Sequence, residues 1–301
     1  MELWIPITIF AAFMQNLRSV LQKVLKGRLS TSGATFSRFA FATPLACLYA
    51  VGLVFVGGYT LPAPHLEFVA YMVTGGLGQI IATALLVYIF SFRNFAVGTT
   101  FSKTETIQTA MFGIVVLGEV ISFAATMAIM VSLAGVVMIS VTKASLNVRD
   151  VMKHGLDKSA LIGIASGAFF GISAVSYRAA SLSLDSGDFV IRAAFTLACV
   201  TVFQTIVMAV YMRIREPGQI TAVLASWRIS AWVGCVGMLG SAGWFTAVTL
   251  QNAAYVRALG QIELLFTFAA SYLFFRERSN PTELFGIALV TTGILILVLL
   301  R

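Results

Sequence analysis

Residues 100–119 read TFSKTETIQTAMFGIVVLGE, and residues 258–277 read ALGQIELLFTFAASYLFFRE. Both stretches continue into apolar runs of the kind that cross membranes, yet they carry Lys103, Glu105 and Glu263 inside the run. An isolated ionised side chain in the hydrocarbon core costs at least about 3 kcal/mol. Such residues therefore face protein or water, and these three are the first candidates for a functional site.

The whole chain has the composition of a membrane protein. Its 301 residues are 59% apolar and 11% charged, with a mean hydropathy of +0.93. The apolar runs are about twenty residues long and do not alternate, which is typical of membrane-spanning helices and not of barrel strands. We therefore predict an all-α, polytopic membrane protein. A window of about 19 residues predicts ten transmembrane helices, at residues 3–24, 31–57, 66–91, 95–117, 122–142, 159–182, 188–212, 229–251, 256–275 and 281–300.

Basic residues in the predicted connections indicate the orientation. Connections after spans one, three, five, seven and nine hold thirteen Lys and Arg residues, whereas the opposite side holds only Arg257 and Arg301. Because cytoplasmic loops retain basic residues, both termini are predicted outside the cytoplasm. The net charge of +8 follows from this asymmetry, and the scatter over five short loops argues against a nucleic-acid site. The thirteen are Lys23, Lys26, Arg28, Arg93, Lys143, Arg149, Lys153, Lys158, Arg213, Arg215, Arg228, Arg276 and Arg278.

The chain also aligns with itself. A shift of 158 residues superposes, without a gap, Asn94 on Asn252, Glu105 on Glu263, Thr109 on Thr267, Glu119 on Glu277 and Gly135 on Gly293. We predict a first five-helix repeat at 1–145, a cytoplasmic linker at 146–158 and a second repeat at 159–301. Five is an odd number, so the second repeat enters the membrane inverted. Many secondary transporters have this architecture and hold the substrate near the midplane.

The end of each predicted repeat resembles a known family. The stretches LGEVISFAATMAIMVSLAGVVMI and FRERSNPTELFGIALVTTGILIL are similar to the end of each five-helix unit in the EamA family of the drug/metabolite transporter superfamily. There, a Glu at a turn precedes an apolar helix with a Gly about sixteen residues later. Arg38 and Arg192 resemble that family's basic residue in the second helix of each unit. The resemblance implies an exporter or permease for small metabolites, with a cavity lined by spans one, three, four, six, eight and nine.

The segment SKTE at 102–105 resembles the bacterial aromatic amino acid exporters more narrowly. This implies amino acid export, with aromatic amino acids favoured, across a bacterial inner (plasma) membrane. The chain departs from the family in one respect. Family members often have Pro in the fourth and ninth helices, and neither predicted helix contains one here, so the sequence gives no basis for assuming a helix break.

The intramembrane charges suggest two roles. Lys103 and Glu105 are two residues apart on a helix, so they project from different faces and require different partners. Counted from the cytoplasmic ends of their helices at about 1.5 Å per residue, Arg38 and Glu105 lie at similar depths, so we predict that they are neighbours. The same count from the outer face places Arg192 near Glu263. Each carboxylate would then form a structural ion pair or couple transport to protons.

Lys103 differs from the other charges because the aligned residue in the second repeat is the neutral Gln261. A structural pair is expected in both repeats, whereas a site for an asymmetric ligand is not. We therefore predict that Lys103 contacts a substrate carboxylate or phosphate; the alternative is that it reaches a helix-end carbonyl or cytoplasmic water. Polar and aromatic faces of other spans complete the predicted substrate-binding set: Lys103, Gln15, Ser19, Gln22, Gln79, Ser173, Tyr177, Trp244 and Gln261.

Other chemistry has little support in the sequence. Both His residues and three of the four Asp residues fall in predicted loops, and Asp188 is the first residue of a predicted span, so no metal site is predicted within the membrane. There is no phosphate-binding loop, and no cofactor is predicted. The expected partners are a small-molecule substrate and membrane lipids, and the predicted activity is export of small amphipathic metabolites by alternating access. The alternatives are a permease for another metabolite class, an intramembrane enzyme with Lys103 as base, and a receptor.

The predicted orientation has a direct test. A topology reporter fused after Arg301 is expected to report a periplasmic or extracellular location, because basic residues gather on the other side. A reporter inserted after Asp150, in the predicted linker, is the matched control and is expected in the cytoplasm. A cytoplasmic signal from the Arg301 fusion contradicts the orientation.

Overall fold

The computed structural model describes residues 2–25, 29–89, 95–143, 158–185, 187–274 and 280–300, and every regular element in these ranges is an α-helix. The predicted all-α class is confirmed. The helices are α1 (Trp4–Leu25), α2 (Thr31–Phe55), α3 (Leu66–Ile89), α4 (Phe95–Ser102), α5 (Glu105–Leu117), α6 (Phe123–Lys143), α8 (Lys158–Ser183), α9 (Phe189–Arg215), α10 (Gln219–Ala225), α11 (Trp227–Leu250), α12 (Ala253–Gly260), α13 (Glu263–Phe274) and α14 (Pro281–Leu299). The predicted linker at 146–158, except Lys158, lies outside the described residues, as do Asn94 and Glu277.

Most of the predicted spans form helices that are long enough to cross a membrane. Among the described residues, seven helices are long and apolar enough to cross a membrane, namely α2, α3, α6, α8, α9, α11 and α14. Each coincides with one predicted span. The first predicted span forms α1, which is long enough but whose second half carries Gln15, Asn16 and Arg18. Spans four and nine are each divided into two shorter helices, so the arrangement of ten spans stays a prediction.

The two divisions are alike. Between α4 and α5, the backbone N–H groups of Lys103 and Thr104 donate to carbonyls three residues earlier, both at 3.1 Å. Between α12 and α13, the N–H groups of Gln261 and Ile262 do the same at 3.2 and 3.0 Å. The prediction of one continuous helix at 95–117 and another at 256–275 is therefore wrong. Neither break contains a proline. At each break a tight turn with i→i−3 hydrogen bonds replaces the α-helical pattern.

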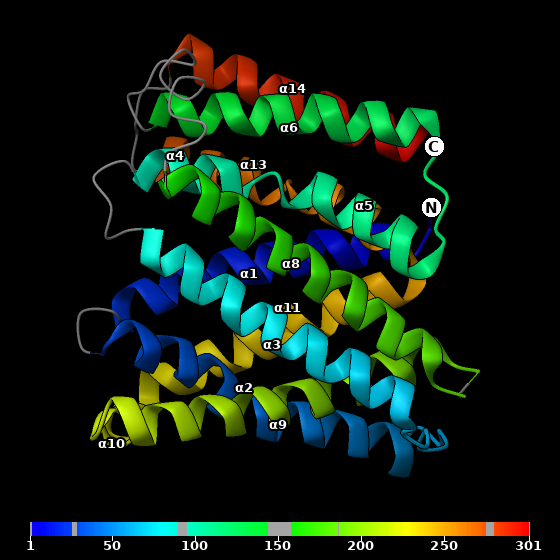
Figure 1. Ribbon diagram of the computed structural model, residues 1–301, viewed down its shortest axis with the longest axis vertical. Helices are drawn as coiled ribbons and strands as arrows, with labels where there is room; N and C mark the ends of the chain where they lie inside the picture. Colours follow the sequence, from blue (N-terminus) through cyan, green and yellow to red (C-terminus); the bar gives the residue numbers. More distant parts are fainter. Residues whose placement is uncertain are drawn as a thin grey trace. The chain divides into compact units, whose positions relative to one another are not determined.

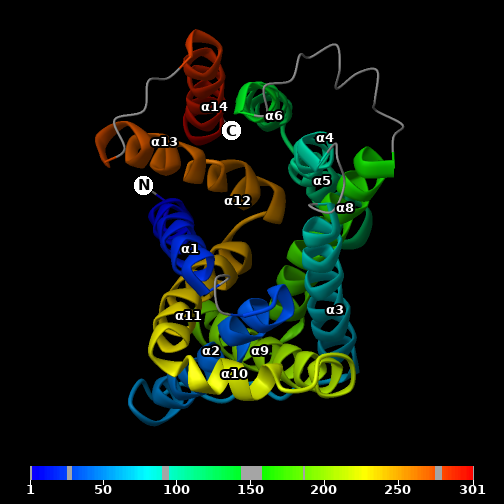
Figure 2. The same cartoon turned by 90° about the vertical axis from the view of Figure 1, so that its left-hand side faces the viewer.

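The divided helices recur at one spacing. The first residues of α12, α13 and α14 each lie 158 residues after the first residues of α4, α5 and α6, which is the shift found in the sequence alignment. In Figure 2, α12 and α13 are drawn in orange as two separate helices. The starts of the helices in the two segments thus correspond residue by residue.

The helices form two compact units, each of which draws residues from both predicted repeats. The first unit contains residues 1–77 and 176–251, and the second contains residues 78–175 and 252–301. The compact units are therefore not the two halves of the sequence. The predicted repeat boundaries at 145 and 159 stay a prediction.

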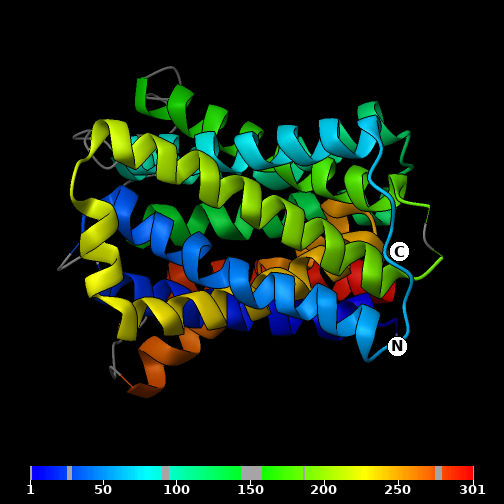
Figure 3. The same cartoon turned by 90° about the horizontal axis from the view of Figure 1, so that it is seen from below.

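In the first unit, α11 packs on α1 and α2, and α2 packs on α9. Figure 3 shows α2 and α9 side by side, with α10 at one end of α9. Glycines of α11 allow the close approach: a Cβ at Gly243 would lie 2.8 Å from Ala11 Cβ, and one at Gly234 would meet the Cβ of Phe41. Tyr177, Leu197 and Phe245 belong to the buried apolar cluster of this unit.

The short helix α10 was not expected, because seven residues within a predicted loop give little periodic signal. The segment is held by polar contacts to the start of α2. Ser30 Oγ donates to Glu216 Oε2 at 2.6 Å, and Ser30 N donates to Gln219 Oε1 at 3.2 Å. At the other end of the unit, His65 links the start of α3 to Ser183 O, 2.6 Å from its Nε2.

In the second unit, α6 and α14 run side by side (Figure 1). The helices are antiparallel and touch at two glycines. A Cβ at Gly135 would lie 2.5 Å from Gly286 O, and a Cβ at Gly293 would lie 2.7 Å from Ala128 O. These two glycines are the pair that the internal alignment superposes. Each is glycine because the backbone of the opposite helix occupies the space that a side chain needs.

Substitution of these glycines is expected to be costly. Gly135→Ala and Gly293→Ala each place a methyl group against backbone atoms, so each is expected to lower the free energy of unfolding by about 1–3 kcal/mol. Gly52→Ala in α2 is the matched control, since a Cβ there has no atom within 4 Å. That control is expected to be neutral or stabilising by less than about 1 kcal/mol. Thermal unfolding of the three purified variants in detergent compares them, and equal effects at all three positions would contradict the packing described.

Candidate functional site

The two helix divisions lie beside each other within the second unit. Helix α12 packs on α5. Gln261, in the turn between α12 and α13, donates from Nε2 to Oγ1 of Thr106 in the first turn of α5, at 3.2 Å. The backbone turns that interrupt two apolar helices are thus brought to one place. Lys103, Glu105 and Glu263 all belong to these turns or to the helix residue that follows them.

Two ion pairs join the divided helices. Lys103 Nζ lies 3.8 Å from Glu263 Oε1, with side-chain exposures of 36% and 25%. Arg257 Nε lies 3.2 Å from Glu105 Oε1, and both of these side chains are 22% exposed. Each pair connects a cation on one divided helix to a carboxylate on the other. The four formal charges sum to zero.

Neither pair is tightly held. The distance of 3.8 Å between Lys103 and Glu263 is close to the limit for an ion pair, and both side chains are partly exposed. Glu105 Oε1 is close to Arg257 but accepts no hydrogen bond from the described part of the chain. Partly exposed pairs with imperfect geometry contribute little to stability, about 0–1 kcal/mol. Their partners are therefore open to exchange.

Helix ends support the four charges. Glu105 and Glu263 are the first residues of α5 and α13, where the helix dipole favours an anion. Arg257 lies in the last turn of α12, and Lys103 directly follows the last residue of α4, where the dipole favours a cation. The breaks thus stabilise charges that a continuous helix would leave at mid-span.

Within the second unit, Glu105 faces Arg257 and Glu263 faces Lys103. The predicted pairing of Glu105 with Arg38 and of Glu263 with Arg192 stays a prediction. The expectation that Lys103 and Glu105 have different partners is confirmed.

Arg257 was missed as a site residue because it was assigned to the outer connection. One sequence signal identifies it. Arg257 and Gln261 are four residues apart and therefore share one face of a helix, and Gln261 aligns with Lys103. The same signal would have placed Arg257 beside the charged segment.

Several predicted residues lie in the first unit. Gln15 Oε1 accepts a hydrogen bond from Trp244 Nε1 at 3.1 Å, which joins α1 to α11. On the same helix, Ser19 Oγ donates to Gln15 O at 2.8 Å, and Gln22 Nε2 donates to Ala34 O at 3.1 Å. The predicted polar face of α1 therefore contacts both α2 and α11.

Arginines of the first unit also have specific surroundings. The side chains of Arg18 and Arg38 converge on Gly237 of α11, where a Cβ would lie 3.3 Å from Arg18 Cδ and 3.5 Å from Arg38 Cγ. Arg192 lies in the first turn of α9. Arg178 donates from Nη1 to carbonyls at the end of α11, at 2.6 Å for Val248 and 2.7 Å for Gln251.

The three remaining predicted residues are on α3 and α8. Tyr177 is 5% exposed, stacks on Phe245 with ring centroids 4.6 Å apart, and accepts a hydrogen bond from the buried Gln204. Ser173 is fully buried, and Gln79 lies in α3 within the second unit. Tyr177 thus belongs to a packed cluster, while Lys103 and Gln261 lie with the charges.

Residues 157–299 match the EamA-like transporter family. No curated protein matches the chain in sequence. A solved structure described as "Crystal structure of protein" matches with a TM-score of 0.70 over 98% of this chain and 96% of that one. Its sequence identity is 14%, so the likeness concerns the fold alone.

The ion pairs can be measured by double-mutant cycles. Glu105→Gln with Arg257→Gln, and Lys103→Gln with Glu263→Gln, are each expected to show a coupling free energy on the order of 1 kcal/mol or less in detergent unfolding. Lys103→Gln with Glu105→Gln is the control cycle, because these neighbours have different partners. The coupling in the control is expected to be clearly smaller. A control value as large as the other two would contradict the pairing.

Proposed function

Since the chain belongs, through residues 157–299, to the EamA-like transporter family, we propose that it is a secondary transporter that exports small amphipathic metabolites by alternating access. Amino acids are the favoured substrates, and aromatic amino acids are favoured among them. The observation that carries this proposal is the neutral cluster of Lys103, Glu105, Arg257 and Glu263 at two adjacent helix breaks. The family consists of transporters, which disfavours the alternative of an intramembrane enzyme.

The cluster is complementary to a zwitterion. An amino acid carries one carboxylate and one ammonium, and the cluster offers cations and carboxylates at ion-pair distance from each other. In the proposed complex, the substrate carboxylate binds Lys103 and the substrate ammonium binds Glu263. The existing pair, at 3.8 Å, is long and partly exposed, so opening it costs little.

Broken helices support the same assignment. Secondary transporters of inverted repeats commonly bind substrates and ions at discontinuous helices, whose free ends carry partial charges. Here the positive ends of α5 and α13 and the negative ends of α4 and α12 lie at the two breaks. A substrate with both charges is stabilised by both kinds of helix end.

The asymmetry of the cluster supports a bound ligand over a purely structural network. In the internal alignment Lys103 corresponds to Gln261, and Arg257 corresponds to Thr99, so neither cation is repeated. Both carboxylates are repeated. A structural network inherited by duplication would keep cations in both copies, whereas an asymmetric substrate selects one.

The proposal extends to the membrane. The protein is proposed to lie in a bacterial inner membrane as two inverted five-helix repeats, with both termini outside the cytoplasm. Support comes from the asymmetric distribution of basic residues and from the 158-residue correspondence of the helix starts. A thermal-shift screen of amino acids comes first, because a bound ligand stabilises the folded protein.

The test separates the two charges of the substrate. Proteoliposomes are loaded with phenylalanine, phenylalaninamide or N-acetylphenylalanine, and efflux is measured. Lys103→Met is expected to reduce efflux of phenylalanine and N-acetylphenylalanine by about tenfold and to leave the amide little changed, because only a carboxylate gains from the ammonium. Glu263→Gln is expected to reduce efflux of phenylalanine and its amide, and to spare the N-acetyl compound.

Lys158→Met is the matched control, since Lys158 is an exposed lysine at the start of α8. It is expected to transport all three compounds at the wild-type rate. All variants are checked for monodispersity, which separates a folding defect from a transport defect. If Lys103→Met affects the acid and the amide equally, or affects neither, Lys103 does not contact a substrate carboxylate.

A further inference from the structure

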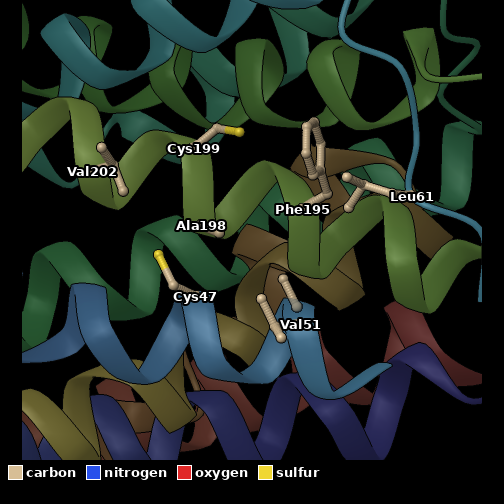
Figure 4. Close-up of a pocket in the computed structure, with 8 residues that line it drawn as sticks. Cys47, Val51, Leu61, Phe195, Ala198, Cys199 and Val202 are labelled. Atoms are coloured by element: carbon tan, nitrogen blue, oxygen red, sulfur yellow. The ribbon is translucent and has the colours of Figure 1, made fainter. Parts of the chain in front are cut away.

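An apolar groove lies on the first unit, between α2 and α9. It has a volume of about 270 Å³ and is lined by Cys47, Ala50, Val51, Leu61, Phe195, Ala198, Cys199 and Val202. Figure 4 shows Cys47 and Val51 on α2 facing the side chains of α9, with Leu61 on the segment that follows α2. None of the lining residues takes part in the charged cluster.

The groove exists because small residues meet where the two helices touch. Ala50 on α2 packs with Ala194 and Ala198 on α9, and these three form a buried cluster. Larger side chains stand on either side of this contact, among them Val51 and Phe195. Small residues at the contact and large residues at the rim leave a channel between them.

The channel follows the helices. On α9 the lining positions 195, 198, 199 and 202 are spaced as one face of a helix, and they extend about 10 Å along its axis. On α2 the lining positions 47, 50 and 51 approach the end of the helix at Phe55, and Leu61 stands beyond that end. The groove therefore begins near one end of two membrane-spanning helices and runs inward.

The lining excludes polar occupants. Apart from the thiols of Cys47 and Cys199, every lining side chain is a hydrocarbon. The rim is open, with Val51 49% and Leu61 60% exposed. A polar solute placed here would lose hydrogen bonds to water without replacing them. A zwitterionic substrate therefore does not fit this groove.

We propose that the groove binds one acyl chain of a bilayer phospholipid. An acyl chain in a bilayer runs from the interface inward, as the groove does. The volume accommodates roughly nine groups the size of a water molecule or a methylene.

Photo-crosslinking tests the proposal on the full-length protein in lipid nanodiscs. Phosphatidylcholine carrying a diazirine near the ester is expected to label Leu61 and Phe195, whereas a diazirine near the middle of the chain is expected to label Cys199 and Val202. Peptide mapping by mass spectrometry reads out both. A free fatty acid with the same diazirine is run in parallel, and labelling by the fatty acid but not by the phospholipid contradicts the proposed source.

A pair of matched substitutions tests the site itself. Val202→Phe fills the groove and is expected to reduce labelling of α2 and α9 about tenfold, through lost apolar contact. Val210→Phe, on the same helix at an exposed position outside the lining, is expected to change it less than twofold, within the range of a non-contact position.

Two results overturn the proposal. One is equal labelling after both substitutions, and the other is wild-type labelling that does not change position with the depth of the diazirine. The depth series needs no variant, so a failure of Val202→Phe to fold does not remove the test. Neither result bears on transport, because the groove shares no residue with the proposed substrate site.

Discussion

In lipid, a charged or hydrogen-bonding group that leaves water must find its partner within the protein. The two helix breaks of the second unit are where this constraint acts most strongly. Each break frees backbone groups, and each is followed by a glutamate at the first residue of the next helix. The tight turns satisfy part of the backbone, and cations from the other divided helix face the carboxylates. The turns, the helix dipoles and the ion pairs therefore all act on the same four charges.

The spans were predictable because bilayer thickness fixes the length of an apolar run, and the helices of the structure begin and end close to the predicted positions. The breaks were not predictable by the same reasoning. Hydropathy averages over a window and does not register a two-residue turn at 103–104 or 261–262. The usual local signal for a break, a proline, is absent from both segments. Helix α10 was missed because its stability comes from contacts with Ser30, which is distant in sequence.

The site shows a similar division between what sequence reveals and what it conceals. Comparing the chain with itself singled out Lys103, Glu105, Glu263 and Gln261, which the structure places at two adjacent turns. The partners could not be derived, because depth along a helix does not determine which face a side chain takes after a break. Arg257 belongs to the same group of charges and was hidden only by its assignment to a connection. The sequence therefore identified most of the residues that meet at the two turns, whereas their pairing within the second unit was found only in the structure.

The paired glycines of α6 and α14 have a consequence for how these helices move and change. Gly135 and Gly293 make reciprocal contacts about 10 Å apart along the two axes, since the residues involved are separated by seven positions on each helix. Two points of contact fix both the position of one helix along the other and its rotation against the other. Any rearrangement elsewhere in the unit is therefore expected to move α6 and α14 together as one rigid body. Over evolutionary time, enlargement of either glycine requires compensation on the opposite helix, so the two sequences are constrained to change together.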